Sequence, residues 1–270
     1  MFRKLWRPAA GGLFLALSTF SVAAAPEGFD GSIERSRLIG TQQLLGEVFH
    51  VQGIALSPQR IWITSVDNAR RQAWLHEFDR ATGRPLRRLE LTDGVRFHPG
   101  GLSFSEGSLW VPVAEMRADS SAVLVEIDAK SFNVRRRIAL PDHIGCLAAS
   151  ADWLVGGNWD SRLLYVFDKQ SGRTERIVPN PSQTRFQDMK IAGNALVAGG
   201  SIDWFSGTVD WIDLATFRIS RTLRAGAIGP VRPFGRGGPL TGEGMAIEGR
   251  DLYLVPEDGP SRVFHYRFDA

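Results

Sequence analysis

Three of the five histidines in this 270-residue chain occupy matching positions in an internal repeat. His50, His98 and His143 each open a short apolar segment, with spacings of 48 and 45 residues. Neutral imidazoles bind Zn, Fe, Cu or Ni, and three of them leave coordination positions for water or substrate. The column predicts a divalent transition-metal site, with Zn or Fe as the ion. A metal-free ligand site and purely structural histidines stay open as alternatives.

Other polar residues of the same segments extend the candidate site. Arg185 opens the fourth repeat at the histidine position, and Gln52, Gln187 and Glu243 stand two residues further into their own repeats. Glu243 is expected to transfer protons or to bind the metal. Arg185 is expected to orient a substrate carboxylate, because a guanidinium binds it bidentately. An ion pair of Arg185 with Glu243 or Asp188 is the structural alternative.

The second connection of each repeat carries further candidates. Asn158, Trp159 and Trp204 are expected to bind substrate, with the indoles as walls for a planar ligand. These connections also carry acidic residues: Asp67, Glu115, Asp160, Asp203, Glu257 and Asp258. The segment 225–240 is rich in Gly, Pro and Arg and breaks the period. It is expected to form a lid through Arg232, Phe234 and Arg236, or else a surface loop without function.

The elements that must position these residues are short β-strands. Each unit of about 45 residues contains up to four β-branched and aromatic runs separated by turns, as propeller blades do. In the first unit these runs are Val51–Leu56, Ile61–Thr64, Leu75–Asp79 and Arg84–Leu91. The fifth unit has three runs, and Glu34–Ile39 resembles the fourth runs of other units. We therefore expect an all-β, five-bladed β-propeller over residues 26–270, closed by an N-terminal strand in the last blade.

A propeller of this kind would bring the candidate residues together. The first strand of each blade lines the central channel, and the segments before first strands and after second strands share one face. The histidine column and the second connections should therefore surround one axial mouth. We expect a small-molecule ligand there.

The N-terminus has the three parts of a secretory signal peptide, predicted over residues 1–25: a basic start, a short apolar run and small residues. A periplasmic or secreted, monomeric protein is expected, with no membrane span. Removal of Arg3, Lys4 and Arg7 would leave 29 basic and 29 acidic residues (32 − 3 against 29), so nucleic acid is not an expected partner. A single cysteine, Cys146, excludes an intramolecular disulfide and a Cys-rich metal site.

The opening Val51-Gln52-Gly53-Ile54 resembles the Thr-Gln-Gly-Leu type motif of plant and bacterial glutaminyl cyclases (glutamine cyclotransferases). That resemblance implies a five-bladed propeller and conversion of an N-terminal glutamine into pyroglutamate. The chain departs from the family at two places. Gly100 stands where the family has an important Glu in Gly-Glu-Gly-Leu, and Gln187-Asp188-Met189 stands opposite an Asn-Glu-Leu-Glu element.

These observations lead to three functional hypotheses. The first is an exported metal-dependent hydrolase or lyase, with His50, His98 and His143 as ligands, Glu243 as proton carrier and Arg185 as substrate clamp. The second is a non-catalytic propeller that binds a ligand or another protein. The third, implied by the resemblance, is a glutaminyl cyclase-like aminoacyltransferase.

Overall fold

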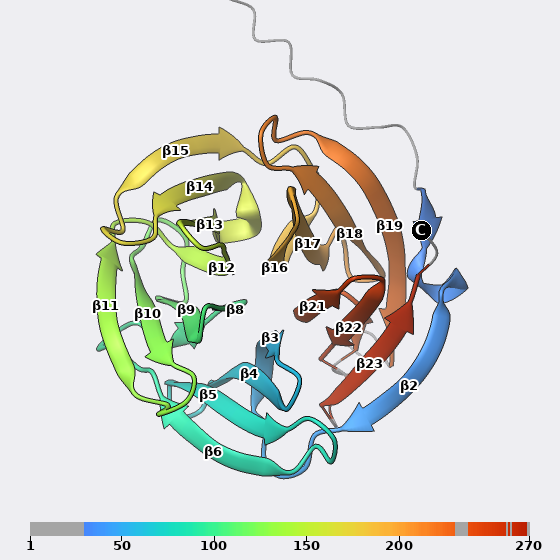
Figure 1. Ribbon diagram of the computed structural model, residues 1–270, viewed down its shortest axis with the longest axis horizontal. Coiled ribbons are helices and arrows are strands. Elements are labelled where there is room, and N and C mark those ends of the chain that lie inside the picture. The colour runs from blue at the N-terminus through green and yellow to red at the C-terminus, as the bar shows by residue number, and fades with distance from the viewer. Residues whose placement is uncertain (1–29, 230–236, 258, 260, 269–270) are drawn as a thin grey trace, which may run out of the picture.

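Five β-sheets stand around a central axis in the computed structural model, which describes residues 30–229, 237–257, 259 and 261–268 (Figure 1). The predicted signal peptide lies outside these residues, as do Arg232, Phe234 and Arg236 of the expected lid. Within the described ranges, no helix is both long enough and apolar enough to cross a membrane. The predicted all-β, five-bladed propeller is confirmed.

The blades follow the chain in order. Blade 1 contains β3 (His50–Leu56), β4 (Arg60–Asp67), β5 (Gln72–Asp79) and β6 (Pro85–Glu90). Blade 2 contains β7 (His98–Pro99), β8 (Ser103–Ser105), β9 (Ser108–Ala114), β10 (Ala122–Asp128) and β11 (Val134–Leu140). Blade 3 contains β12 (Ile144–Ala149), β13 (Trp153–Asn158), β14 (Leu163–Asp168) and β15 (Thr174–Pro179), with the 3-10 turn η2 (Trp159–Ser161) after β13.

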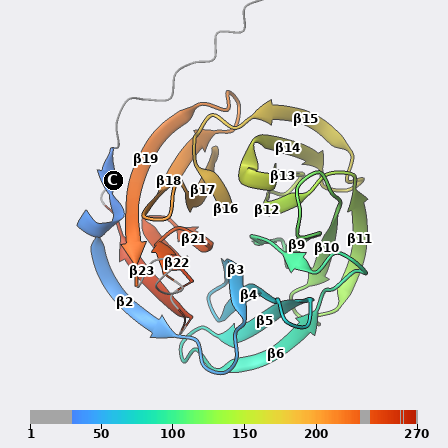
Figure 2. The same cartoon turned by 180° about the vertical axis from the view of Figure 1, so that it is seen from behind.

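The last two blades differ from this pattern in their number of strands. Blade 4 contains β16 (Arg185–Ala192), β17 (Ala195–Ser201), β18 (Ser206–Asp213) and β19 (Ile219–Ile228), and β20 (Gly238–Pro239) pairs back onto β19. Blade 5 contains β21 (Gly244–Glu248), β22 (Asp251–Val255) and β23 (Arg262–Arg267). The first strand of every blade is the innermost one (Figures 1 and 2).

An N-terminal strand closes the ring, as predicted. β2 (Arg37–Gln43) pairs antiparallel with β23 and becomes the outer strand of blade 5 (Figure 1). It begins later than the predicted run Glu34–Ile39, because the 3-10 turn η1 (Ile33–Arg35) precedes it and buries Ile33. A pairing that the sequence did not suggest joins β1 (Gly31–Ser32) in parallel to β19 of blade 4.

The hydrophobic core is divided among the blade interfaces. Buried side chains form five clusters, one between each pair of neighbouring blades. Trp62 belongs to the cluster of blades 1 and 2, and Trp110 to that of blades 2 and 3; both are buried. The apolar faces of the strands thus pack between neighbouring blades. Polar residues lie at the ends of the channel.

A buried carboxylate ties three blades together near the axis. Asp188 of β16 accepts hydrogen bonds from the backbone N–H groups of Ile54 (2.9 Å) and Met245 (3.1 Å), in blades 1 and 5. Its other oxygen accepts from Lys190 Nζ at 2.5 Å and from the N–H of Met189 at 2.9 Å. Burial raises the pKa of Asp188 to about 6, and the Lys190 ammonium acts against that rise. Asp188 is therefore a structural residue, and its ionic partner is Lys190, not Arg185.

Candidate functional site

The three histidines of the column line one cavity at the mouth of the channel. His50 and His98 are the first residues of β3 and β7, and His143 directly precedes β12. All three border a cavity of about 260 Å³, here called the His cavity. Gln52, Asn158 and Trp159 border it as well, whereas the sequence only placed these residues on one face. The repeat thus accounts for the convergence of the three histidines, because equivalent positions of the blades lie close to the axis.

A second cavity lies beside the first. The Arg cavity, of about 250 Å³, is bordered by Arg185, Asp203, Trp204 and Glu257. The two cavities share Asp160, Gln187 and Glu243, so they are neighbouring parts of one mouth. The two predicted tryptophan walls are consequently separated: Trp159 faces the His cavity, and Trp204 faces the Arg cavity.

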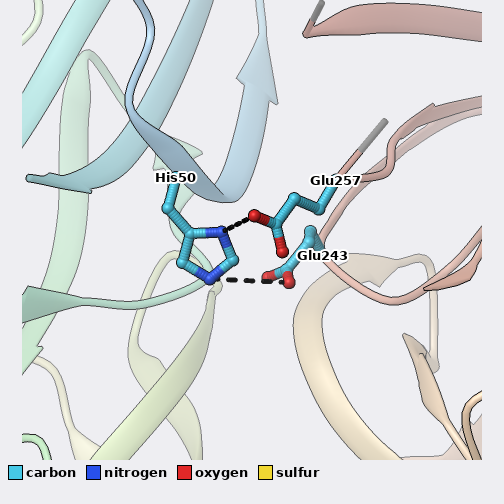
Figure 3. A group of neighbouring side chains, drawn as sticks. All are labelled: His50, Glu243 and Glu257. Carbon is cyan, nitrogen blue, oxygen red and sulfur yellow. Dashed lines mark ion pairs between the residues drawn. The ribbon is translucent and has the colours of Figure 1, made fainter. Parts of the chain in front are cut away.

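A histidine and two glutamates converge where the cavities meet (Figure 3). Nδ1 of His50 lies 3.0 Å from a carboxylate oxygen of Glu257, and its Nε2 lies 3.8 Å from one of Glu243. Among the described residues, these three form the only group of at least three His, Cys, Asp or Glu whose ligand atoms lie within 4.8 Å of one another. One nitrogen and two carboxylate oxygens are a suitable donor set for Zn or Fe(II).

The group takes its members from the two blades that meet where the ring closes. His50 comes from blade 1, while Glu243 precedes β21 and Glu257 follows β22 in blade 5. Their side chains are only 13–16% exposed. Gln52 supports the arrangement, since its amide donates to Glu243 at 3.4 Å and to the Val51 carbonyl at 2.9 Å.

The other two histidines are held neutral. Burial lowers the pKa of His98 to about 4, and the neighbouring His143 and His50 act in the same direction. Burial also lowers the pKa of His143. Nδ1 of His98 is buried and makes no hydrogen bond to the part of the chain that the structure describes. Both rings therefore present neutral nitrogens beside the converging group, and their ligation of a metal stays a prediction.

Arg185 does not form either of the ion pairs considered from the sequence. Its guanidinium donates one hydrogen bond, to the carbonyl of Ile202 at 3.2 Å. No ion pair links it to any described residue, whereas Asp188 is bound to Lys190. The charge of Arg185 is therefore free to meet a ligand in the Arg cavity.

The remaining predicted residues have mixed roles. Asn158 borders the His cavity, but its amide is used internally: its oxygen accepts from the N–H of Leu163 at 2.9 Å, and its nitrogen donates to Asp142 at 3.3 Å. Trp159 contacts His143 edge-on, with ring centroids 4.8 Å apart. Trp204 is 58% exposed and remains available to a ligand. The described parts of segment 225–240 form β20 and its pairing with β19.

Glu257 is the functional candidate to which sequence reasoning gave no role. A pattern could have singled it out, because every blade carries a carboxylate at the end of its second strand or just after it. Glu257 belongs to that series, but a repeat pattern does not tell which member faces a histidine of the next blade. That depends on the way the fifth blade meets the first.

The comparisons with known proteins agree with this architecture. Residues 42–258 match the profile of a family of unknown function, DUF6454. The chain belongs to this family. No curated protein matches it in sequence. Its fold is similar to the crystal structure of Myxococcus xanthus glutaminyl cyclase, with a TM-score of 0.63, 15% identity, and coverage of 87% of this chain and 96% of that one. It is also similar to a chain of the mitotic checkpoint complex, with a TM-score of 0.52, 11% identity and the same coverages.

One position separates this family member from the cyclase motif for a steric reason. Gly100 stands where the resembling motif has a Glu, and a Cβ atom there would lie 1.9 Å from the carbonyl oxygen of Gly145. No side chain fits at that distance. The acidic residue of the motif is thus absent, and the packing of blade 2 against blade 3 leaves no space for it.

Proposed function

We propose that this protein binds one divalent transition metal through His50, Glu243 and Glu257 and acts on a small molecule at the axial mouth, as a metal-dependent hydrolase or lyase. The observation that carries the proposal is the convergence of these three side chains in a largely buried position between two cavities. Three protein ligands leave coordination positions for a substrate, as catalytic sites require. Such an ion supplies Lewis-acid polarisation of a substrate carbonyl and lowers the pKa of a bound water.

The residues around the group have roles that follow from their state. Burial disfavours protonation of His98 and His143, so they would contact the substrate as uncharged hydrogen-bond partners. Arg185 faces the Arg cavity without an ionic partner and would orient an anionic group of the substrate. Gln52 holds Glu243 in position through its amide.

Elemental analysis of the purified protein and of single variants tests the proposal. We expect about one Zn or Fe per chain in the unaltered protein, and loss of the metal in Glu257→Gln and His50→Ala. Glu90→Gln, on the exposed outer strand β6, is the control and should keep the metal. A protein without metal, even after soaking with Zn, Fe, Cu and Ni, would contradict the proposal.

The same experiment separates this site from one built on the three histidines. If His50, Glu243 and Glu257 form the ligand set, His143→Ala keeps the metal and Glu257→Gln loses it. If the three histidines form it, the pattern is reversed. Retention in both variants would indicate that the ion is bound elsewhere.

A metal-free function has an observation in its favour. The two glutamates face opposite nitrogens of the His50 ring, an arrangement that also suits an imidazolium held between two carboxylates. The protein would then be a ligand-binding propeller without metal chemistry, and thermal-shift measurements with small metabolites would replace the metal assay. A cyclase activity is less well supported, because Gly100 replaces the acidic residue of that motif.

Export is part of the proposal. The three-part N-terminal segment 1–25 is typical of a signal peptide, and cleavage after Ala25 would release residues 26–270 into the periplasm or medium. Mass spectrometry of the protein from the periplasmic fraction tests this directly. A product that retains Met1–Ala25 in the cytoplasm would contradict it.

A further inference from the structure

We infer that the mouth recognises a zwitterion of the α-amino-acid type, with Asp160 binding its ammonium group and Arg185 its carboxylate. This inference names the substrate class of the proposed site, although the binding contacts themselves do not depend on a metal. It rests on the internal repeat, because the other blades show what a carboxylate in this connection does when it has a structural task.

In three blades the carboxylate at or just after the end of the second strand accepts hydrogen bonds from the loop that follows. Asp67 accepts from the N–H groups of Ala69 and Arg70 and from the Arg70 guanidinium, the last at 2.7 Å. Glu115 accepts from Ser121 and Arg117. Asp203 accepts from the N–H groups of Phe205 and Ser206, both at 2.8 Å. These bonds lower the pKa of all three groups, with Arg70, Ser121 and the N–H of Phe205 as the largest causes.

Blade 3 differs, because a residue other than the carboxylate accepts the hydrogen bond that holds the loop. Asn158 accepts from the N–H of Leu163 and thereby closes the loop. The Asp160 side chain makes no hydrogen bond and no ion pair with any described residue. In blade 5 the equivalent Glu257 faces His50. Asp160 is thus the one carboxylate of the series in the described chain that has neither a structural nor a histidine partner.

The backbone holds Asp160 in an unusual conformation. Asp160 and Ser161 have φ values of 56° and 50°, which non-glycine residues adopt rarely. Ser161 is buried and fixes this turn, since its hydroxyl donates to the carbonyl of Phe186 at 2.9 Å. As a result Asp160 projects to a point that borders both the His cavity and the Arg cavity.

Arg185 is the matching free cation. It borders the Arg cavity together with Asp160, and the two also share a third cavity of about 460 Å³ between blades 3 and 4. They do not neutralise each other, since no ion pair links them. Two uncompensated opposite charges on one small cavity suit a ligand that carries both charges itself.

The Arg cavity has room for a small ligand. Its volume is about 250 Å³, and it adjoins the His cavity of about 260 Å³ through shared residues. An amino acid or a dipeptide is therefore suitable, and Trp204 offers an exposed ring for its side chain. Glu243 and Glu257 border the same cavity, so a bound zwitterion would lie beside the proposed metal ligands.

Calorimetric titration with matched ligands tests the inference. The probes are first the standard L-amino acids. Two analogues of the amino acid that binds most tightly follow: its amide, which lacks the carboxylate, and its N-acetyl form, which lacks the ammonium. The proteins are the unaltered chain, Asp160→Asn and Arg185→Gln. Asparagine tolerates positive φ, so Asp160→Asn should fold normally. Asp119→Asn and Arg71→Gln alter exposed charges in other second connections that border neither cavity, and serve as controls.

We expect removal of either charge from the ligand to raise the Kd roughly tenfold or more. This effect should disappear when the protein residue that binds that charge has already been replaced. Arg185→Gln should weaken the amino acid but leave the affinity of the amide unchanged. Asp160→Asn should weaken the amino acid and leave that of the N-acetyl form unchanged. The inference is overturned if no amino acid binds, or if either variant weakens all three probes equally.

The metal assay keeps the two proposals apart. Titrations are run with the chelator-treated protein and with the metal-loaded protein, and the metal content of Glu257→Gln is measured separately. If Asp160→Asn and Arg185→Gln each weaken amino-acid binding as expected, while no metal is bound, the zwitterion site is upheld and the metalloenzyme is contradicted. If metal is bound through Glu257 but neither variant weakens amino-acid binding, the metal site is upheld and the zwitterion site is contradicted.

Discussion

Nδ1 of His50 lies 3.0 Å from a carboxylate oxygen of Glu257, although the two residues belong to the first and the last blade (Figure 3). Their contact exists only because the ring is closed. β2 joins β23, and the chain then continues from β2 into β3, which begins with His50. The candidate metal site and the closure of the propeller therefore depend on the same interface between blades 5 and 1.

Leu44→Ala should weaken that interface. Leu44 follows β2, is 1% exposed and packs in the cluster shared by blades 5 and 1. Removal of its side chain should lower the free energy of unfolding by about 2–5 kcal/mol, because a cavity remains. Leu45→Ala is the matched control, since Leu45 is 42% exposed. Urea unfolding of both variants is the measurement, and equal losses would contradict a closure role for Leu44.

Metal removal should destabilise the protein if the proposed site is occupied. A ligand present at a hundred times its Kd stabilises the folded state by about 2.7 kcal/mol. We therefore expect chelation to lower the Tm of the unaltered protein and to leave that of Glu257→Gln unchanged. Differential scanning calorimetry with and without chelator measures this. An equal fall of Tm in both proteins would show that the chelator acts at another site.

Gly100→Ala should disrupt the contact between blades 2 and 3. The added Cβ would lie 1.9 Å from the carbonyl oxygen of Gly145, and backbone atoms cannot move aside as a flexible side chain can. We expect a loss of roughly 3 kcal/mol or more in the free energy of unfolding. Gly40→Ala, in β2, is the control, because a Cβ there meets no atom within 4 Å. A stable Gly100→Ala protein would contradict the steric argument against a cyclase-type acid at this position.

Acid should destabilise the protein in part through His76. Burial lowers the pKa of His76 from 6.5 to about 4, with Arg88 acting in the same direction. Between those two pH values the unfolded chain binds a proton that the folded protein does not, so stability falls as the pH falls from 6.5 towards 4. The difference in pKa corresponds to about 3 kcal/mol when the whole window has been crossed.

His76→Gln isolates that contribution. Glutamine can keep a hydrogen bond to Ser65, whose hydroxyl lies 2.8 Å from His76 Nε2, but it does not titrate. The free energy of unfolding is measured by urea titration at several pH values. We expect a shallower fall below pH 6.5 in the variant, whereas parallel curves for the two proteins would contradict a neutral, buried His76.

The sequence by itself determined the architecture. Repeating strand and turn patterns predict five blades, and the three-stranded last unit predicts a closing N-terminal strand, because an unpaired edge must be covered. The histidine column also follows from the repeat, since equivalent positions reach the same end of the channel. The exact start of β2 did not follow, because the burial of Ile33 in a preceding turn is a tertiary effect.

Only the tertiary structure decided how the mouth residues combine. The sequence predicted a metal at His50, His98 and His143, which line one cavity, and the structure adds Glu243 and Glu257 beside His50. Each blade carries a carboxylate at the end of its second strand or just after it, and whether it closes a loop, faces a histidine or stays free depends on neighbouring blades. The physical reason is the separation along the chain of the residues that interact. Strand patterns are local and repeat along the chain, while charges, hydrogen bonds and steric limits at the axis arise between residues far apart in sequence.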